Sequence, residues 1–148
     1  MLLKVVIAAV AVAVAVAVAV IVFTLPMQSA PGAPNVRFTE YTPDRLDIKV
    51  GESTKIVFNV QNMESRNIND SQVVTVIEPS GYQPYLSIDR PTIELPDLQG
   101  KDARTGEMQV AITVTGSPAK EALYVVKGVL MVEGKQSDVR QFDLRIRQ

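Results

Sequence analysis

The segment from Asn62 to Ser71, NMESRNINDS, brings together side chains whose oxygens are of the type that binds Ca²⁺ in proteins. The candidates are Glu64, Asn67, Asn69 and Asp70. Their spacing matches no defined calcium loop, so two interpretations stay open: a calcium-binding loop or a solvated connection between strands. We expect the solvated connection and predict no metal site.

The triplet NDS, which starts at Asn69, fits the acceptor pattern for N-glycosylation. Such short matches arise often by chance, and the aspartate in the middle position is unfavourable. Asn69 is therefore a candidate glycosylation site, provided that this part of the chain lies outside the cytoplasm.

Histidine and cysteine are absent from all 148 residues. Without them the Ser-His-Asp and Cys-His nucleophiles cannot form, and neither can the common zinc sites or a blue-copper centre. No glycine-rich phosphate loop is present, and a net charge of −1 argues against a nucleic-acid-binding surface. The sequence predicts a protein that is not an enzyme, needs no cofactor and takes no small-molecule substrate.

The stretch EPSGYQPYL, Glu78 to Leu86, is rich in turn-forming residues and carries two tyrosines. Tyr82 and Tyr85 on a rigid loop would suit contact with a partner protein. The alternative is that both tyrosines pack over the end of the domain. We take them as candidate partner-contact residues and leave both interpretations open.

The first 25 residues of the chain indicate where the protein is located in the cell. From Val5 to Phe23 no residue is polar. Nineteen residues in a helix span about 28 Å, which is close to the thickness of the hydrocarbon core of a bilayer. The alternation of Ala and Val has the period of a strand, but a lone strand cannot satisfy its backbone in lipid. We therefore predict a transmembrane helix.

The helix is expected to remain attached as a signal anchor. Its apolar run is longer than that of a cleavable signal, and cleavage after Ala30 would place Pro31 directly behind the cut. Lys4 and the amino terminus favour an N-terminus inside the cell, with the C-terminal domain extracytoplasmic.

On a helix, alanines four residues apart line one face, as do Ala9, Ala13 and Ala17. This small-xxx-small pattern allows another helix to approach closely. The alternative is a low-complexity anchor with no packing role. We predict that these three alanines are helix-packing residues.

Residues 1–25 thus form the predicted anchor, and residues 26–35 a linker rich in Pro and Gly. Residues 36–148 alternate apolar and polar positions in many short runs. RLDIKV places Leu46, Ile48 and Val50 on one side, and TKIVFNVQ places Thr54, Ile56, Phe58 and Val60 on one side. Further runs lie at 72–78, 107–115, 123–134 and 140–147, with weaker ones at 36–41, 85–88 and 92–95. Seven to nine such strands predict an antiparallel immunoglobulin-like β-sandwich.

The run IKVGESTKIVFNVQN, Ile48 to Asn62, resembles the NEW3 and CARDB-type immunoglobulin-like modules of archaeal and bacterial envelope proteins. In these modules a Gly-Glu-Ser or similar turn leads into a strand that ends in Asn. The layout of one membrane helix and one sandwich is also similar to archaellum stator proteins and to accessory subunits of membrane enzyme complexes. The resemblance implies an extracytoplasmic binding or spacer role and no catalytic residue.

Two classes of function follow. The first is a non-catalytic, single-pass membrane subunit whose helix and sandwich pack against other membrane or envelope proteins in a larger complex. The second is a free-standing surface-binding or adhesion module, against which the absence of Trp and the scarcity of aromatic residues count. The run from Arg140 to Arg147 is a further candidate, as a free sheet edge for a partner strand; the alternative is that its arginines keep that edge soluble.

Overall fold

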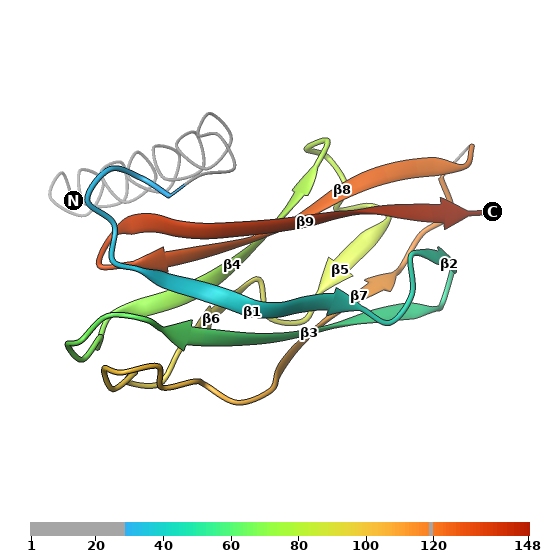
Figure 1. The fold of residues 1–148 in the computed structure, drawn as a ribbon. Helices are drawn as coiled ribbons and strands as arrows, with labels where there is room; N and C mark the ends of the chain where they lie inside the picture. Colours follow the sequence, from blue (N-terminus) through green and yellow to red (C-terminus); the bar gives the residue numbers. More distant parts are fainter. Residues whose placement is uncertain (1–28, 119) are drawn as a thin grey trace, which may run out of the picture.

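A computed structural model describes residues 29–118 and 120–148, and these residues form a two-layered β-sandwich (Figure 1). The predicted anchor, with Ala9, Ala13 and Ala17, lies outside the described residues. The four-stranded sheet has the order β1 (Val36–Pro43), β3 (Ser53–Asn62), β7 (Met108–Val114) and β5 (Leu86–Ile88). The five-stranded sheet has the order β2 (Asp47–Lys49), β9 (Lys135–Arg147), β8 (Ala122–Val132), β4 (Ser71–Glu78) and β6 (Thr92–Glu94).

The core between the sheets follows from the alternation in the sequence, because successive side chains of a strand point to opposite faces. In β3 the four predicted inward positions, Thr54 to Val60, are each fully buried. In β9 the predicted inward run ends in Leu144 and Ile146, both buried. The all-β prediction is confirmed, and the weak runs at 36–41, 85–88 and 92–95 are strands as well.

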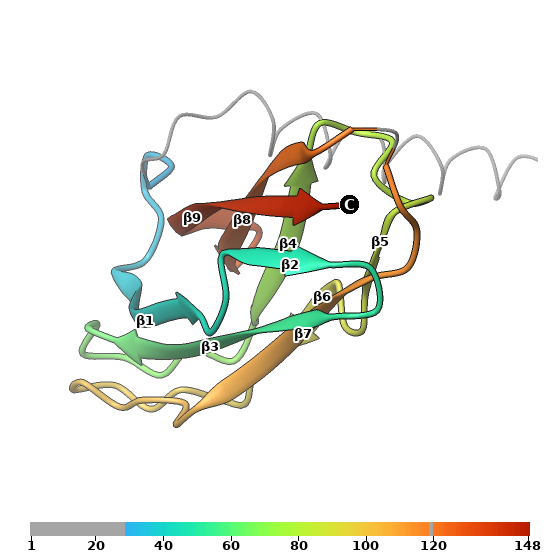
Figure 2. The ribbon, with the colours of Figure 1, turned by 90° about the vertical axis from the view of Figure 1, so that its right-hand side faces the viewer.

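One pair of strands departs from the predicted antiparallel arrangement. β2 pairs with β9 in parallel, with Ile48 opposite Ile146. The chain passes from one sheet to the other after β1 without reversing, so β2 runs in the same direction as β1 and β9 (Figures 1 and 2). β2 is also shorter than expected: only Ile48 is buried, while Leu46 is 54% and Val50 46% exposed. Both flanking residues lie outside the strand, which ends after Lys49.

The predicted free edge at Arg140–Arg147 is closed at its end. β9 pairs with β8 from Ala122–Ile146 to Val132–Lys135, and β2 pairs with its other side over the last three residues, Arg145 to Arg147. The arginine at 147 donates to both carboxylate oxygens of Asp47 at 2.8 and 2.7 Å, which ties β9 to β2.

Residues 29–35 of the predicted linker lie along the start of β9 (Figure 1). The Ala30 backbone N–H donates to the Gln136 carbonyl at 2.7 Å, and the Ser29 hydroxyl donates to the Ser137 carbonyl at 2.5 Å. The described chain therefore starts fastened to the β8–β9 hairpin. In the described part of the chain, no helix has the length and apolar character needed to cross a membrane.

Candidate functional site

The most unusual surface of the molecule is the outward face of the five-stranded sheet. Register places Val74 of β4, Val129 of β8 and Val139 of β9 side by side in one row across three strands. Val129 and Val139 are buried and form a small hydrophobic cluster separate from the core between the sheets, and the half-buried Val74, Val76 and Met131 pack against it. The sheet is thus apolar on both faces at this position.

The apolar surface continues along β8, because every second residue of a strand shares its face. Leu123, Val125, Val129 and Met131 occupy four of the five outward positions of β8, and Lys127 is the fifth. We name this surface the apolar outer face. It consists of Val74, Val76, Leu123, Val125, Val129, Met131 and Val139.

The outward face of the four-stranded sheet provides an internal comparison. It presents mostly polar side chains, such as Lys55, Gln109 and Thr113, and the Ser53 and Thr113 hydroxyls lie 2.7 Å apart in a hydrogen bond. An antiparallel sheet with one solvated face has polar side chains on that face. The contrast between the two sheets indicates that the five-stranded sheet is built to be covered on its outer side.

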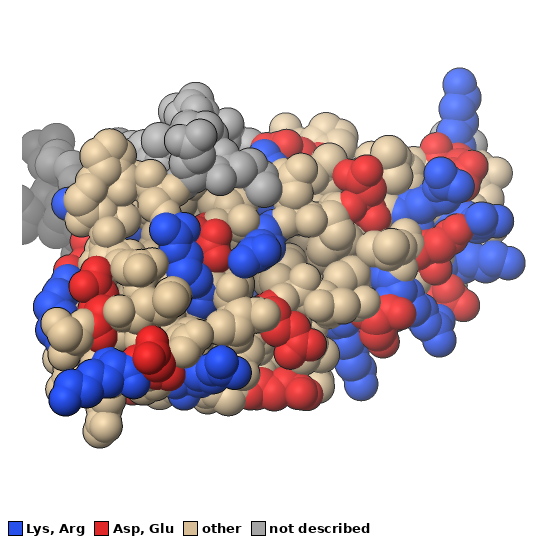
Figure 3. All heavy atoms as spheres, viewed as in Figure 1, with Lys and Arg blue, Asp and Glu red and all other residues tan. Residues whose placement is uncertain are grey.

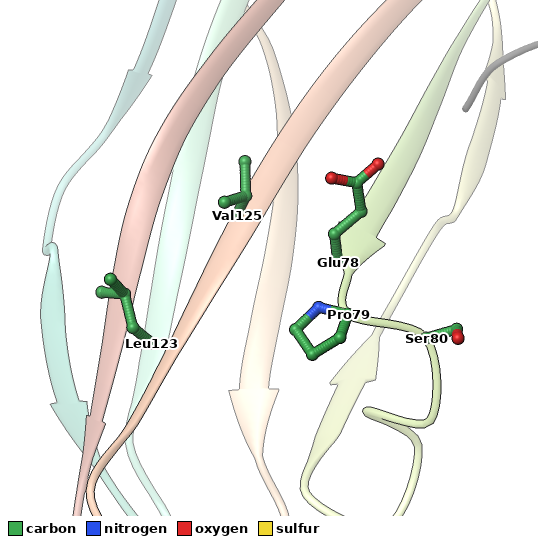
Figure 4. A pocket seen from close by; sticks show the side chains of 5 residues that line it. All are labelled: Glu78, Pro79, Ser80, Leu123 and Val125. Carbon is green, nitrogen blue, oxygen red and sulfur yellow. The ribbon is translucent and has the colours of Figure 1, made fainter. Parts of the chain in front are cut away.

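Two open hollows flank Leu123 at the end of this face. One, of about 580 Å³, lies between Leu123 and Val125 of β8 and the Glu78–Ser80 segment that follows β4 (Figure 4). The other, of about 290 Å³, lies between Leu123, Leu46 and the end of β9. Leu123 is 55% exposed, so it stands as an apolar ridge between two hollows.

One ion pair lies within the face. The Lys127 Nζ is 3.0 Å from the Glu78 Oε1, and the two side chains are 20% and 30% exposed. The pair neutralises the only cation in the outward row of β8, and the aliphatic stem of Lys127 continues the apolar surface. The outward row of β8 therefore carries little net charge.

The predicted partner-contact tyrosines lie next to this region. Tyr82 and Tyr85 are both half-buried and pack against the core, and the Tyr82 carbonyl accepts from the Tyr85 N–H at 2.8 Å. Burial, with a smaller contribution from the neighbouring Tyr85, raises the pKa of the Tyr124 phenol. The packing interpretation is thus realised, and a role of Tyr82 and Tyr85 in partner contact stays a prediction.

The predicted oxygen-rich loop uses its side chains within the domain. Glu64 Oε1 accepts from the Asn35 N–H at 2.6 Å, and Asn67 Oδ1 accepts from the Gly100 N–H at 3.0 Å. Asn69 and Asp70 are exposed. Within residues 29–118 and 120–148, no group of three or more acidic side chains is placed to hold a metal ion. Asn69 is accessible, and its glycosylation stays a prediction.

The apolar outer face is not among the sequence predictions, although its strands carry a signal for it. VVTVI in β4 and LYVVKGVLMV in β8 are nearly continuous apolar runs, which are typical of strands that are covered on both faces. The sequence predictions use only the inward positions of these strands and give no role to the outward valines.

No family model and no curated protein matches the chain. Among solved structures, it is similar to the CARDB domain of the PF1109 protein from Pyrococcus furiosus, in complex with di-metal ions. The TM-score is 0.48 at 15% identity, over 78% of this chain and 90% of that one. CARDB is one of the module types that the sequence resembles.

Two further structures are similar at low identity. The alkylpurine DNA glycosylase AlkC of Pseudomonas fluorescens, bound to DNA, matches with a TM-score of 0.48 and 12% identity, over 78% of this chain. This chain spans only 31% of that one. A Niemann-Pick type C2 protein from the Japanese carpenter ant matches with a TM-score of 0.43 and 7% identity, over 83% of this chain and all of that one.

Proposed function

We propose that this protein is a non-catalytic, single-pass membrane subunit whose extracytoplasmic sandwich contacts a partner in a larger membrane or envelope complex. The apolar outer face carries the proposal, because a sheet that is apolar on its outer side needs a covering surface. The apolar run Val5–Phe23 and the resemblance to envelope modules support the membrane location. The partner is a protein, and we infer no role for a nucleic acid or a small-molecule substrate.

The charge distribution supports a protein partner of low net charge. On the side of the molecule seen in Figure 3, lysines and arginines are interspersed with aspartates and glutamates, and no large field of one sign is present. Long-range electrostatic steering is therefore weak, and specificity rests on shape and apolar contact. The ridge formed by Leu123, with a hollow on each side, provides such a shape.

The experiment is native electrophoresis of membranes solubilised in mild detergent, with mass spectrometry of the proteins that migrate with this chain. We expect the chain to migrate in a defined large complex. We also expect mass spectrometry to detect a peptide that includes Lys4, since this peptide is present only if the anchor is retained. The variant Leu123→Ser/Val125→Ser is expected to leave the complex while staying folded and membrane-bound. Its matched control, Lys55→Ser/Val57→Ser on the other sheet, keeps the complex. Migration of the unsubstituted chain as a monomer contradicts the proposal and favours a free-standing surface module.

A further inference from the structure

The described chain starts beside the apolar outer face. Ser29 and Ala30 are hydrogen-bonded to Ser137 and Gln136, and Val139 of the face follows two residues after Ser137. Only residues 24–28 separate this attachment from Phe23, the last residue of the apolar run. The six residue steps from Phe23 to Ser29 reach about 20 Å at most, which limits how far the end of that run can lie from the attachment.

The dimensions of the two apolar surfaces match. From Leu123 to Met131 the face extends over eight residue steps of β8, or about 27 Å. The run Val5–Phe23 is about 28 Å long as a helix. Its side chains are Val, Ala, Ile and Phe, and the alanines permit close approach to a flat surface.

We propose that, until it enters a bilayer, the segment Val5–Phe23 covers the apolar outer face of its own sandwich. The short tether gives the segment an effective concentration in the millimolar range at the face, which favours it over any second molecule. This inference rests on the proposed function, since the same segment is there the membrane anchor. Insertion into the bilayer would uncover the face for the partner.

The energetics allow an exchange between the two sites. Apolar burial stabilises both by roughly 25 cal/mol per Å² of apolar surface removed from water. The bilayer surrounds the segment on every side, whereas the sheet covers one side of it. The segment therefore binds the sheet when no membrane is present and inserts into the bilayer when membrane is present.

The test uses the full chain, which has no native cysteine, with engineered cysteine pairs. Met131→Cys on the face is combined with Ala9→Cys or with Ala19→Cys, near the two ends of the segment. The control combines the same segment positions with Lys55→Cys on the polar sheet. Each chain is synthesised in a cell-free system without lipid or with nanodiscs and treated with a short bifunctional maleimide. The mass on a denaturing gel separates links within one chain from links between chains.

Without lipid, we expect a monomeric chain in which Met131→Cys is linked to a segment position. The yield of this link should lie well above that of the Lys55→Cys control. The link should be lost when nanodiscs are supplied. Sedimentation of the lipid-free chain as aggregate, or linking no greater than in the control, overturns the inference. Resistance to carbonate extraction tests the anchor separately. Insertion without any lipid-free link rejects the docking and leaves the proposed function intact. A link that persists beside nanodiscs without insertion rejects the membrane anchor and leaves the docking intact.

Discussion

At the scale of single residues, the contact between Tyr41 and Gly128 controls how closely the two sheets approach. The Tyr41 ring lies over Gly128, where a Cβ atom would overlap the ring, and makes tilted contacts with Phe38 at 5.3 Å and Phe142 at 6.2 Å between centroids. Its buried hydroxyl has no hydrogen-bond partner in the described part of the chain. Burial also raises the pKa of this phenol, so it stays neutral.

Two substitutions at this contact are expected to act in opposite directions. Tyr41→Phe removes an unsatisfied hydroxyl and keeps the ring, so it should stabilise the fold by about 1 kcal/mol. Gly128→Ala forces a methyl group into the ring and should destabilise it by about 1–3 kcal/mol. Thermal unfolding of the full chain in detergent, followed by circular dichroism, measures both. A lower midpoint for Tyr41→Phe would show that the hydroxyl is hydrogen-bonded after all.

At the scale of elements, a bulge in β9 fastens the incoming chain to the sandwich. The register with β8 shifts between Leu130 and Met131, so that Ser137 is left without an opposite residue. Its hydroxyl oxygen lies 2.8 Å from the Pro34 carbonyl and 2.5 Å from the Val36 carbonyl, and the Val36 N–H approaches it at 3.3 Å. One fully buried side chain thus holds the start of β1.

Ser137→Ala should therefore cost about 1–2 kcal/mol of unfolding free energy, since it removes the buried hydrogen bonding of this hydroxyl to the backbone of Pro34 and Val36. It should also expose residues 29–35 to limited proteolysis. Ser71→Ala is the matched control, because Ser71 is also buried but its hydroxyl has no hydrogen-bond partner among the described residues. Equal losses in the two variants would show that Ser137 acts by packing alone.

The strands of this fold are predictable from the sequence, whereas their pairing is not. Alternation is local, so it identified every strand in the described residues, including the short β5 and β6. It could not reveal that β2 lies parallel to β9, since the paired residues Ile48 and Ile146 are far apart in the chain. Nor could it tell that Leu46 and Val50 lie outside β2 and are exposed. The apolar outer face was partly predictable, from runs in which both faces of a strand are apolar.

At the scale of the whole molecule, the length of the chain limits how far apart the two proposed partner contacts, the alanines and the apolar outer face, can lie. If Val5–Phe23 spans the bilayer, residues 24–28 keep the attachment at the β8–β9 hairpin within about 20 Å of the membrane surface. The apolar outer face then begins just above the lipid. A partner that itself crosses the membrane can pack against Ala9, Ala13 and Ala17 and against this face at the same time, and each contact raises the effective concentration for the other.

This arrangement predicts that the alanines matter for assembly and not for anchoring. Ala13→Leu/Ala17→Leu fills the groove that admits a neighbouring helix and raises the hydrophobicity of the segment, so the chain should stay in the membrane but leave its complex. Val14→Leu/Val18→Leu changes the same number of side chains on the valine ridge and should keep the complex. Native electrophoresis and carbonate extraction of both variants separate assembly from insertion. Unchanged migration of the alanine variant would restrict recognition to the sandwich, because a helix contact that tolerates two added isobutyl groups is not close-packed.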